Sequence, residues 1–259
     1  FACIFYTWVI NMLGIVKGDI RFDYLHEMIK DSICSKDLAD FLWIDRLLLP
    51  FSGVDSYLNI KQSNLNLLDI LKENAVETIY TGTANDALKE LCLKRHIRLV
   101  ELLKLPEFTI PNARLTAYGI IDYLNRGDRA VCDQRIFLLG YGHISNSLAQ
   151  LLTCYRCDFA IYTPHDIEQK FVLLDGYRLE EIEHAGKYDI TINTIPKNLE
   201  VDYLLWKDKT ILDVASFPYG FDLDRIQDEG IRYEIYGAIP SKFAPASAAK
   251  IIKRILEKY

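Results

Sequence analysis

The sequence predicts an α/β protein with two domains, each built on a parallel sheet. Short apolar runs alternate with helical patterns from Leu13 to the end of the chain, and this alternation breaks once, between residues 105 and 133. Strand–helix alternation implies parallel pairing with right-handed crossover connections. A length of 259 residues allows one large or two modest domains. We therefore expect the domain boundary at the break.

The first half is expected to form the smaller, flavodoxin-like α/β domain, over residues 1–114. The helix expected nearest the N-terminus carries Phe22, Leu25 and Ile29 on one face, at the spacing i, i+3 and i+7. The segment 31–45 is too short for a complete strand–helix unit. The strands expected are 13–16, 46–49, 78–80 and 98–100, and the helices are 22–30, 65–73 and 86–94.

The break contains two prolines, a helical pattern at 115–124 and the turn-prone residues 125–128. We interpret residues 115–133 as a connecting helix and linker. Residues 134–246 are then the second domain. Its expected strands are 135–139, 159–162, 190–193, 211–213 and 233–235, and its helices are 145–154, 166–174, 202–205 and 223–229.

One amphipathic helix is left over after the last strand. The pattern at 247–258 places Ile251, Ile252, Ile255 and Leu256 on one face. Because the second sheet is already complete, we expect residues 247–259 to return to the first domain.

The composition is that of a soluble globular protein, with 50% hydrophobic and 25% charged residues. The net charge of −6 and the dispersed positive residues argue against nucleic acid or an anionic membrane as the main partner. The six cysteines are scattered through a chain too large to need disulfides. They indicate reduced thiols and a cytoplasmic protein.

The N-terminal segment 1–16 is apolar, but it lacks a basic leading region and a small-residue cleavage site. It is also short for a membrane span. We expect neither a signal peptide nor a span. Met12 is a candidate natural start, which would make residues 1–11 additional sequence.

Cys154 and Cys157 form the only closely spaced cysteine pair. Zinc would require a second pair or histidines at metal spacing, and a redox pair normally opens a helix instead of closing one. We expect no metal site, and we interpret both cysteines as small buried hydrophobes.

The stretch RIFLLGYGHISNSLAQLL, residues 135–152, resembles the start of a dinucleotide-binding unit. Gly140 and Gly142 supply the tight turn and the close backbone approach to a pyrophosphate, whereas Ser145 replaces the third, packing glycine. An apolar helical face follows. The stretch predicts a doubly wound sheet of the Rossmann type with pyrophosphate over Gly140–Ile144; the alternative is a plain α/β turn that binds nothing.

The second strand of this unit ends at Thr163, where NAD sites usually place Asp or Glu for the ribose hydroxyls. The absence of a carboxylate at this position favours NADP slightly over NAD. No arginine is present for a 2′-phosphate, and His165 is either a solvated loop residue or a phosphate ligand. The cofactor expected is NADP or NAD.

Further motifs follow the glycine turn in an order similar to that of the dehydrogenase (A) subunits of dipicolinate synthase. Those of the second half are INTIP (192–196), DVASFPYGFD (213–222) and GAIPSKFAP (237–245). Those of the first half are VKGDIR (16–21), LLLPFSG (47–53), IYTG (79–82) and PNARLTAYG (111–119). The chain is identified by these motifs as a divergent member of that family, from about Leu13 to its end.

The resemblance implies a two-domain Rossmann-type dehydrogenase of spore-forming bacteria, active in sporulation. Its substrate would be a tetrahydrodipicolinate-type dicarboxylate, oxidised to dipicolinate with NADP or NAD. The partners it implies are a flavoprotein-like second subunit and further copies of the chain in an oligomer.

Ligands of such sheets bind beyond the carboxyl ends of the strands. The cofactor is therefore expected to contact Gly140, Gly142, His143, Ile144, Thr163, Thr194, Pro196 and Ala215. For His143 the alternative is simple exposure. The substrate is expected in a cleft between the domains, at Ser52, Gly53, Thr81, Gly82, Asn112 and Thr116.

The catalytic candidates are Asp213, Ser216 and Lys242. Asp213 is placed to act as a base, although an aspartate at a strand end often only bonds local amides. Lys242 could bind a substrate carboxylate or be a solvated lysine. Ser216 would lie against the nicotinamide.

Three positions that are charged in the family are uncharged here, at Tyr118, Phe217 and Ala246. Tyr118 either presents its phenol to the substrate or packs in the connecting helix. These replacements leave open a catalytically impaired, nucleotide-binding relative with a regulatory or structural role. A third possibility is a dehydrogenase of another small carboxylate.

Overall fold

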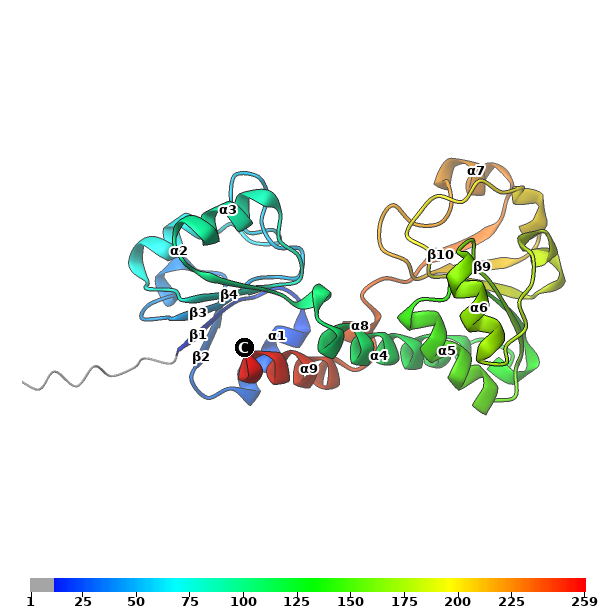
Figure 1. Ribbon diagram of the computed structural model, residues 1–259, viewed down its shortest axis with the longest axis horizontal. Helices are drawn as coiled ribbons and strands as arrows, with labels where there is room; N and C mark the ends of the chain where they lie inside the picture. Colours follow the sequence, from blue (N-terminus) through cyan, green and yellow to red (C-terminus); the bar gives the residue numbers. More distant parts are fainter. Residues whose placement is uncertain (1–11) are drawn as a thin grey trace, which may run out of the picture. The chain divides into compact units, whose positions relative to one another are not determined.

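The computed structural model describes residues 12–259 and divides them into two compact units (Figure 1). The prediction that residues 1–11 are additional sequence concerns residues outside the described part of the chain. The N-terminal unit comprises the chain up to Pro111 together with Ala244–Tyr259, and the C-terminal unit comprises Asn112–Phe243. Among the described residues no helix is both long and apolar enough to cross a membrane.

The N-terminal unit is a five-stranded parallel sheet in the order β2-β1-β3-β4-β5. This is the strand order of flavodoxin-like sheets. Helices α2 and α3 cover one face, and α1 and α9 cover the other (Figure 1). The strands are β1 (Leu13–Val16), β2 (Ser32–Ser35), β3 (Arg46–Leu48), β4 (Thr78–Thr81) and β5 (Arg98–Glu101). The helices are α1 (Ile20–Met28), α2 (Leu67–Glu73), α3 (Asp86–Lys94) and α9 (Pro245–Lys258).

Strand β2 was not expected from the sequence. It pairs in parallel with β1, from Leu13 beside Ser32 to Val16 beside Ser35. Only a single 3₁₀ turn, Leu38–Asp40, follows before β3. The segment 31–45 therefore keeps its strand and replaces the crossover helix by this turn, which explains its short length.

Helix α9 packs against α1 in the N-terminal unit. Its apolar face is buried, and Ile252 is fully inaccessible to solvent. At its end, Lys258 forms an ion pair with Glu107, and the Arg98 guanidinium donates to the Tyr259 carbonyl at 2.6 Å. The chain passes from one unit to the other twice, after Pro111 and after Phe243.

Helix α4 (Pro106–Leu124) is longer than the expected connecting helix and begins nine residues earlier. Proline suits the first helical position because its fixed φ is helical and an N–H there has no partner within the helix. The division between the two units falls inside α4, after Pro111. Gly119 lies against α8 (Ile239–Phe243), where an added Cβ would come within 2.3 Å of Ile239.

The C-terminal unit is a second five-stranded parallel sheet, in the order β10-β9-β8-β6-β7. Alternate residues of β6 enter different cores: Ile136 and Leu138 pack with α4, α5 and α6, whereas Phe137 and Leu139 pack on the opposite side. The strands are β6 (Arg135–Leu139), β7 (Asp158–Tyr162), β8 (Ile190–Asn193), β9 (Thr210–Asp213) and β10 (Arg232–Ile235). The further helices are α5 (His143–Cys154), α6 (Asp166–Leu174) and α7 (Leu223–Asp228), and a 3₁₀ helix forms at Tyr203–Trp206.

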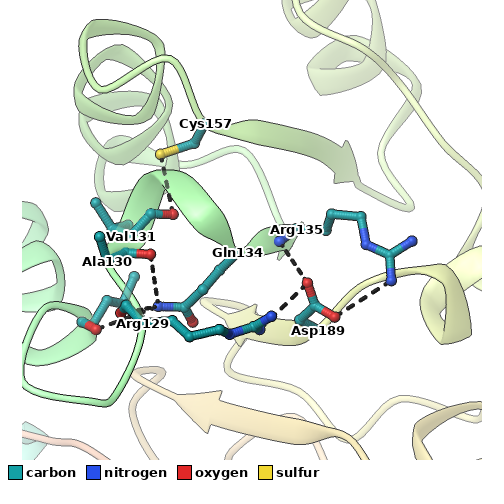
Figure 2. A network of polar contacts seen from close by, with 8 residues as sticks. Arg129, Ala130, Val131, Gln134, Arg135, Cys157 and Asp189 are labelled. Atoms are coloured by element: carbon teal, nitrogen blue, oxygen red, sulfur yellow. Dashed lines mark hydrogen bonds and ion pairs between the residues drawn. The ribbon is translucent and has the colours of Figure 1, made fainter.

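A polar network holds the amino edge of this sheet (Figure 2). The Asp189 carboxylate accepts a hydrogen bond from the Arg135 backbone N–H at 2.9 Å and lies within 3.5 Å of the Arg129 and Arg135 guanidinium groups. Gln134 donates to the carbonyls of Arg129 and Ala130. These groups bond one another at the starts of the strands. Ligands of such sheets bind at the opposite edge, where the strands have their carboxyl ends.

Candidate functional site

The carboxyl edge of the C-terminal unit gathers several of the expected cofactor residues. Because β6, β7, β8 and β9 are parallel, their ends meet at one edge of the sheet. Gly140, Thr163, Thr194 and Val214 each follow directly after one of these strands. The topological switch lies at β6, which pairs with β7 on one side and β8 on the other. Dinucleotides bind across such a switch point.

The glycine turn between β6 and α5 has the features that a pyrophosphate requires. Gly140 has a φ of +91°, and an added Cβ would lie 2.7 Å from the Thr194 hydroxyl, so only glycine fits. An added Cβ on Gly142 meets no atom within 4 Å, so this backbone faces open space. No side chain caps α5 among the described residues. Its first N–H groups are free to bind an anion, and the residues therefore fit the phosphates of a dinucleotide.

Ser145 performs the packing task of the missing third glycine. It is completely buried, and its hydroxyl lies 2.9 Å from that of Thr194. Thr194 donates to the Leu139 carbonyl at 2.8 Å, so Ser145 is the donor to Thr194. The two hydroxyls tie α5 and the end of β8 to β6, and they are used within the protein.

Next to the glycine turn lies a carboxylate that the sequence analysis missed. Thr163 is buried at the end of β7, and its hydroxyl donates to Glu168 Oε2 at 2.5 Å. The same oxygen accepts the backbone N–H of Tyr141 at 3.1 Å. Glu168 comes from the first turn of α6, five residues after Thr163. In the sequence, the one indication of this carboxylate was that a glutamate, Glu168, follows shortly after Thr163, the strand-end position at which an acidic residue is usual.

The next expected residue, Asp213, is completely buried and fully hydrogen-bonded. One carboxylate oxygen accepts the N–H of Ala215 at 3.0 Å. The other accepts the Gly220 N–H at 2.9 Å, the Asn193 amide at 3.0 Å and the Tyr233 phenol at 2.8 Å. Burial, and then the bond to Asp213, raises the pKa of the Tyr233 phenol. Four donors from the surrounding protein hold this buried carboxylate, which favours the local structural role for Asp213.

The other expected residues of this unit differ in exposure. His143 is the exposed first residue of α5, and Ile144 is half-buried against the core. Pro196 and Ser216 are exposed, whereas Ala215 is buried. Lys242 is exposed, with its ammonium 5.2 Å from the centre of the Tyr236 ring.

Helix α4 carries the remaining expected residues. The Thr116 hydroxyl donates to the Asn112 carbonyl at 3.0 Å, so this hydroxyl is satisfied within the helix. The Asn112 side-chain oxygen is buried and has no hydrogen-bond partner among the described residues. Tyr118 is 44% exposed.

In the N-terminal unit, two loops at the ends of β3 and β4 interlock. Gly53 has a φ of +66°, and an added Cβ on it would lie 2.7 Å from the Thr83 carbonyl. An added Cβ on Gly82 would come within 2.3 Å of the Phe51 carbonyl. The Thr81 hydroxyl donates to the Thr83 carbonyl at 3.1 Å. These glycines are therefore needed for the contact between the loops.

The hydroxyl of Ser52 is the unsatisfied group of this edge. Its oxygen is buried without a hydrogen-bond partner among the described residues. Beside it, the Arg21 guanidinium lies 4.3 Å from the centre of the Phe51 ring and donates to Asp19 through Nε at 2.9 Å. Arg21 is mostly buried, and the sequence analysis did not count it as a site residue. An unsatisfied hydroxyl and a guanidinium paired with Asp19 therefore lie at the carboxyl edge of the N-terminal sheet.

Comparisons with known proteins agree with this architecture. No protein-family model matches the chain. The chain is 24% identical over 254 residues to the dipicolinate synthase A subunit of Bacillus subtilis, covering 92% of this chain and 86% of the relative. The chain is a divergent relative of the dipicolinate synthase A subunit.

Solved structures share the fold of this relative. The dipicolinate synthase A subunit of Bacillus halodurans superposes with a TM-score of 0.79 at 21% identity, covering 96% of this chain and 97% of that chain. A D-isomer-specific 2-hydroxyacid dehydrogenase of Lactobacillus delbrueckii, solved in complex with NAD, superposes with a TM-score of 0.56 at 11% identity, covering 96% of this chain and 95% of that chain. The Rossmann-type α/β architecture expected from the sequence is confirmed.

The departures of this dipicolinate synthase relative from the family motifs lie in distinct surroundings. Phe217 is 82% exposed in the loop after β9, and Tyr118 is exposed on α4. Ala246 is half-buried in the first turn of α9. None of the three is a core position, so the changes at 118, 217 and 246 leave the fold intact.

Proposed function

We propose that the chain is an NAD(P)-dependent oxidoreductase whose C-terminal unit binds the dinucleotide across the glycine turn. The observation that carries this proposal is the open backbone at Gly142, directly before an uncapped helix N-terminus. A plain structural turn has no need for such an opening, whereas a pyrophosphate requires it. A bound nicotinamide dinucleotide would supply hydride transfer.

The chain's own residues would hold and orient that dinucleotide. The N–H groups at the start of α5 would bind the pyrophosphate, with Gly142 keeping the approach clear. Pro196 and Ala215 follow the ends of β8 and β9, the side of the switch point away from β7. They would line the nicotinamide half. His143 would lie beside the phosphates.

The substrate class proposed is a small dicarboxylate of the tetrahydrodipicolinate type, oxidised to dipicolinate. The relative in Bacillus subtilis, a dipicolinate synthase component by name, supports this class. So does the N-terminal unit, where the Ser52 hydroxyl is unsatisfied and the Arg21 guanidinium, paired with Asp19, would contribute its remaining N–H donors. Buried carboxylates require such partners. Thr81, Gly82, Asn112 and Thr116 stay in the proposed substrate set with Ser52 and Gly53.

A catalytically impaired relative is the second candidate, and the surroundings of Asp213 favour it. Asp213 is completely buried, and four donors hold its carboxylate within the protein, away from any substrate that it would deprotonate. Ser216 and Lys242 remain as the accessible catalytic candidates of this unit. If neither supports turnover, the chain would bind nucleotide in a regulatory or structural role.

The test has two stages. First, the thermal stability of the protein is measured with NAD, NADH, NADP and NADPH, because a ligand at 100 times its dissociation constant adds about 2.7 kcal/mol to the free energy of unfolding. No shift with any of the four would overturn the proposal.

Second, a tetrahydrodipicolinate-type substrate is supplied, and reduced nicotinamide is followed by absorbance with and without a flavoprotein-like second subunit. Turnover in either arm supports the enzyme. Intact nucleotide binding without turnover in both arms supports the impaired relative. The oligomeric state of the active species follows from light scattering on the same samples.

A further inference from the structure

Glu168 connects α6 to the glycine turn across 27 residues of sequence. Its Oε2 atom is 2.5 Å from the Thr163 hydroxyl and 3.1 Å from the Tyr141 backbone N. Its carboxylate therefore lies between the end of β7 and the first residue after Gly140. This is the place at which dinucleotide sites put an acidic residue for the adenosine ribose.

The position of this carboxylate is not explained by helix capping. A glutamate in the first turn of a helix often bonds the N–H of the cap residue. In α6 the cap residue is His165, and its N–H points to the Thr163 hydroxyl at 3.4 Å instead. Glu168 accepts both of its hydrogen bonds through Oε2, and Oε1 has no protein partner among the described residues. Glu168 thus keeps one oxygen available beside the glycine turn.

The described residues that line the groove around Glu168 include no lysine or arginine. It has a volume of about 380 Å³ and is lined by Tyr141, Gly142, His143, Asn146, Glu168, Phe171 and Asp175. Its second carboxylate, Asp175, accepts a hydrogen bond from the Tyr141 phenol at 2.6 Å. A groove with two carboxylates and no strong cation suits ribose hydroxyls, which donate hydrogen bonds. Next to these carboxylates, away from the N–H groups at the start of α5, a further phosphate on the ribose would be repelled, because it carries negative charge and only accepts hydrogen bonds.

We propose that Glu168 makes the chain select NAD(H) over NADP(H), in the role that an acidic residue at position 163 would otherwise have. This inference rests on the proposed nucleotide site. Oε1 would accept a hydrogen bond from a ribose hydroxyl, while the negative charge would oppose the 2′-phosphate. The preference is opposite to the one that Thr163 alone suggested, because the carboxylate comes from the following helix.

The test compares wild type with Glu168→Gln and with Asp166→Asn, which removes the same charge from an exposed site on the same helix outside the groove. NADH and NADPH are titrated by nicotinamide fluorescence. Wild type and Asp166→Asn should bind NADH at least about tenfold more tightly than NADPH, because like charges in contact are costly. Glu168→Gln should reduce this ratio by about tenfold, chiefly through tighter NADPH binding.

A second measurement needs no variant. Wild type should bind 5′-AMP more tightly than 2′,5′-ADP, since the two differ only in the 2′-phosphate. Equal affinities, a preference for the 2′-phosphate, or an unchanged ratio in Glu168→Gln would overturn the role of Glu168 while leaving the nucleotide site in place. Failure of wild type to bind any of these nucleotides would overturn the nucleotide site itself.

Discussion

The Ser145 hydroxyl donates a hydrogen bond to the Thr194 hydroxyl, 2.9 Å away, within the wall of the glycine turn. This contact is directed into the protein, because Ser145 is completely buried. The residue that departs from the dinucleotide fingerprint thus strengthens the joint between α5 and β8. The departure therefore need not weaken nucleotide binding.

Replacing Ser145 by alanine should lower stability without changing nucleotide affinity. The change removes one buried hydrogen bond, and Thr194 keeps its bond to the Leu139 carbonyl. The free energy of unfolding should fall by about 1 kcal/mol. Denaturant unfolding and nucleotide titration measure the two quantities, with Ser147→Ala on the same helix as the control. A tenfold loss of nucleotide affinity in Ser145→Ala alone would mean that this hydroxyl contacts the ligand.

Replacing Gly142 by valine should abolish nucleotide binding and leave the fold intact. A Cβ added at this position meets no protein atom within 4 Å, and the valine side chain would project into the space assigned to the pyrophosphate. Gly127→Val is the matched control, since an added Cβ there meets only the Leu124 carbonyl at 3.9 Å, in the loop before the amino edge of the sheet. Thermal shifts with the dinucleotides provide the measurement. Normal nucleotide binding by Gly142→Val would contradict the site.

Replacing Asp213 by asparagine should destabilise the C-terminal unit. Whichever way the carboxamide turns, its NH₂ group faces a donor, because both carboxylate oxygens accept hydrogen bonds. The expected loss is about 2–4 kcal/mol. Tyr233→Phe removes a single bond to the same carboxylate and should cost about 1 kcal/mol.

Circular dichroism and turnover distinguish the two roles of Asp213. If Asp213 has a structural role, stability and activity should fall together in Asp213→Asn. A stably folded Asp213→Asn with no turnover, beside a fully active Tyr233→Phe, would instead identify Asp213 as the base.

Replacing Ile252 by alanine should destabilise the N-terminal unit, although this residue lies near the C-terminus. Ile252 is fully buried in α9, which packs on α1. Truncating such a side chain costs about 2–4 kcal/mol. Hydrogen exchange should become faster in α1 and the first sheet and remain unchanged in the second sheet. Lys250→Ala, at an exposed position of α9, serves as the control, and faster exchange confined to the second sheet would refute the assignment.

The Asp189 network should make the C-terminal unit sensitive to acid. Burial raises the pKa of Asp189, but the hydrogen bonds from Arg135 and the charges of Arg135 and Arg129 outweigh this effect, so its pKa lies below the ordinary value. The stability that a depressed pKa contributes is present above the unfolded pKa of about 4 and is lost as the pH falls through the folded pKa.

The difference in unfolding free energy between wild type and Asp189→Asn should therefore be constant near neutral pH and shrink below pH of about 4. Asp133→Asn, an exposed change nearby, should show no such pH dependence. Denaturant unfolding at several pH values checks both variants. A difference that stays constant down to acid pH would exclude the charge of Asp189 as its cause.

Most strands and helices could be predicted because their signal is local. The alternation of apolar runs with helical patterns placed β6 and α3 at their observed limits, and the position of the first two glycines indicated the turn at β6. The exceptions follow from long-range pairing. β2 is a strand because it pairs with β1, and α4 continues back to Pro106 although two prolines suggested a break.

The sequence by itself determined the class of fold, the glycine turn and the family resemblance, because periodicity and motif order are properties of neighbouring residues. Only the tertiary structure decided which polar groups are free. Asp213 and Thr194 occur in the expected motifs, yet residues distant in sequence occupy their hydrogen-bonding capacity. The carboxylate beside Thr163 comes from Glu168, in the first turn of α6, and accepts the N–H of Tyr141, 27 residues away. A side chain's partners are set by the folding of distant segments onto one another, and no local pattern records them.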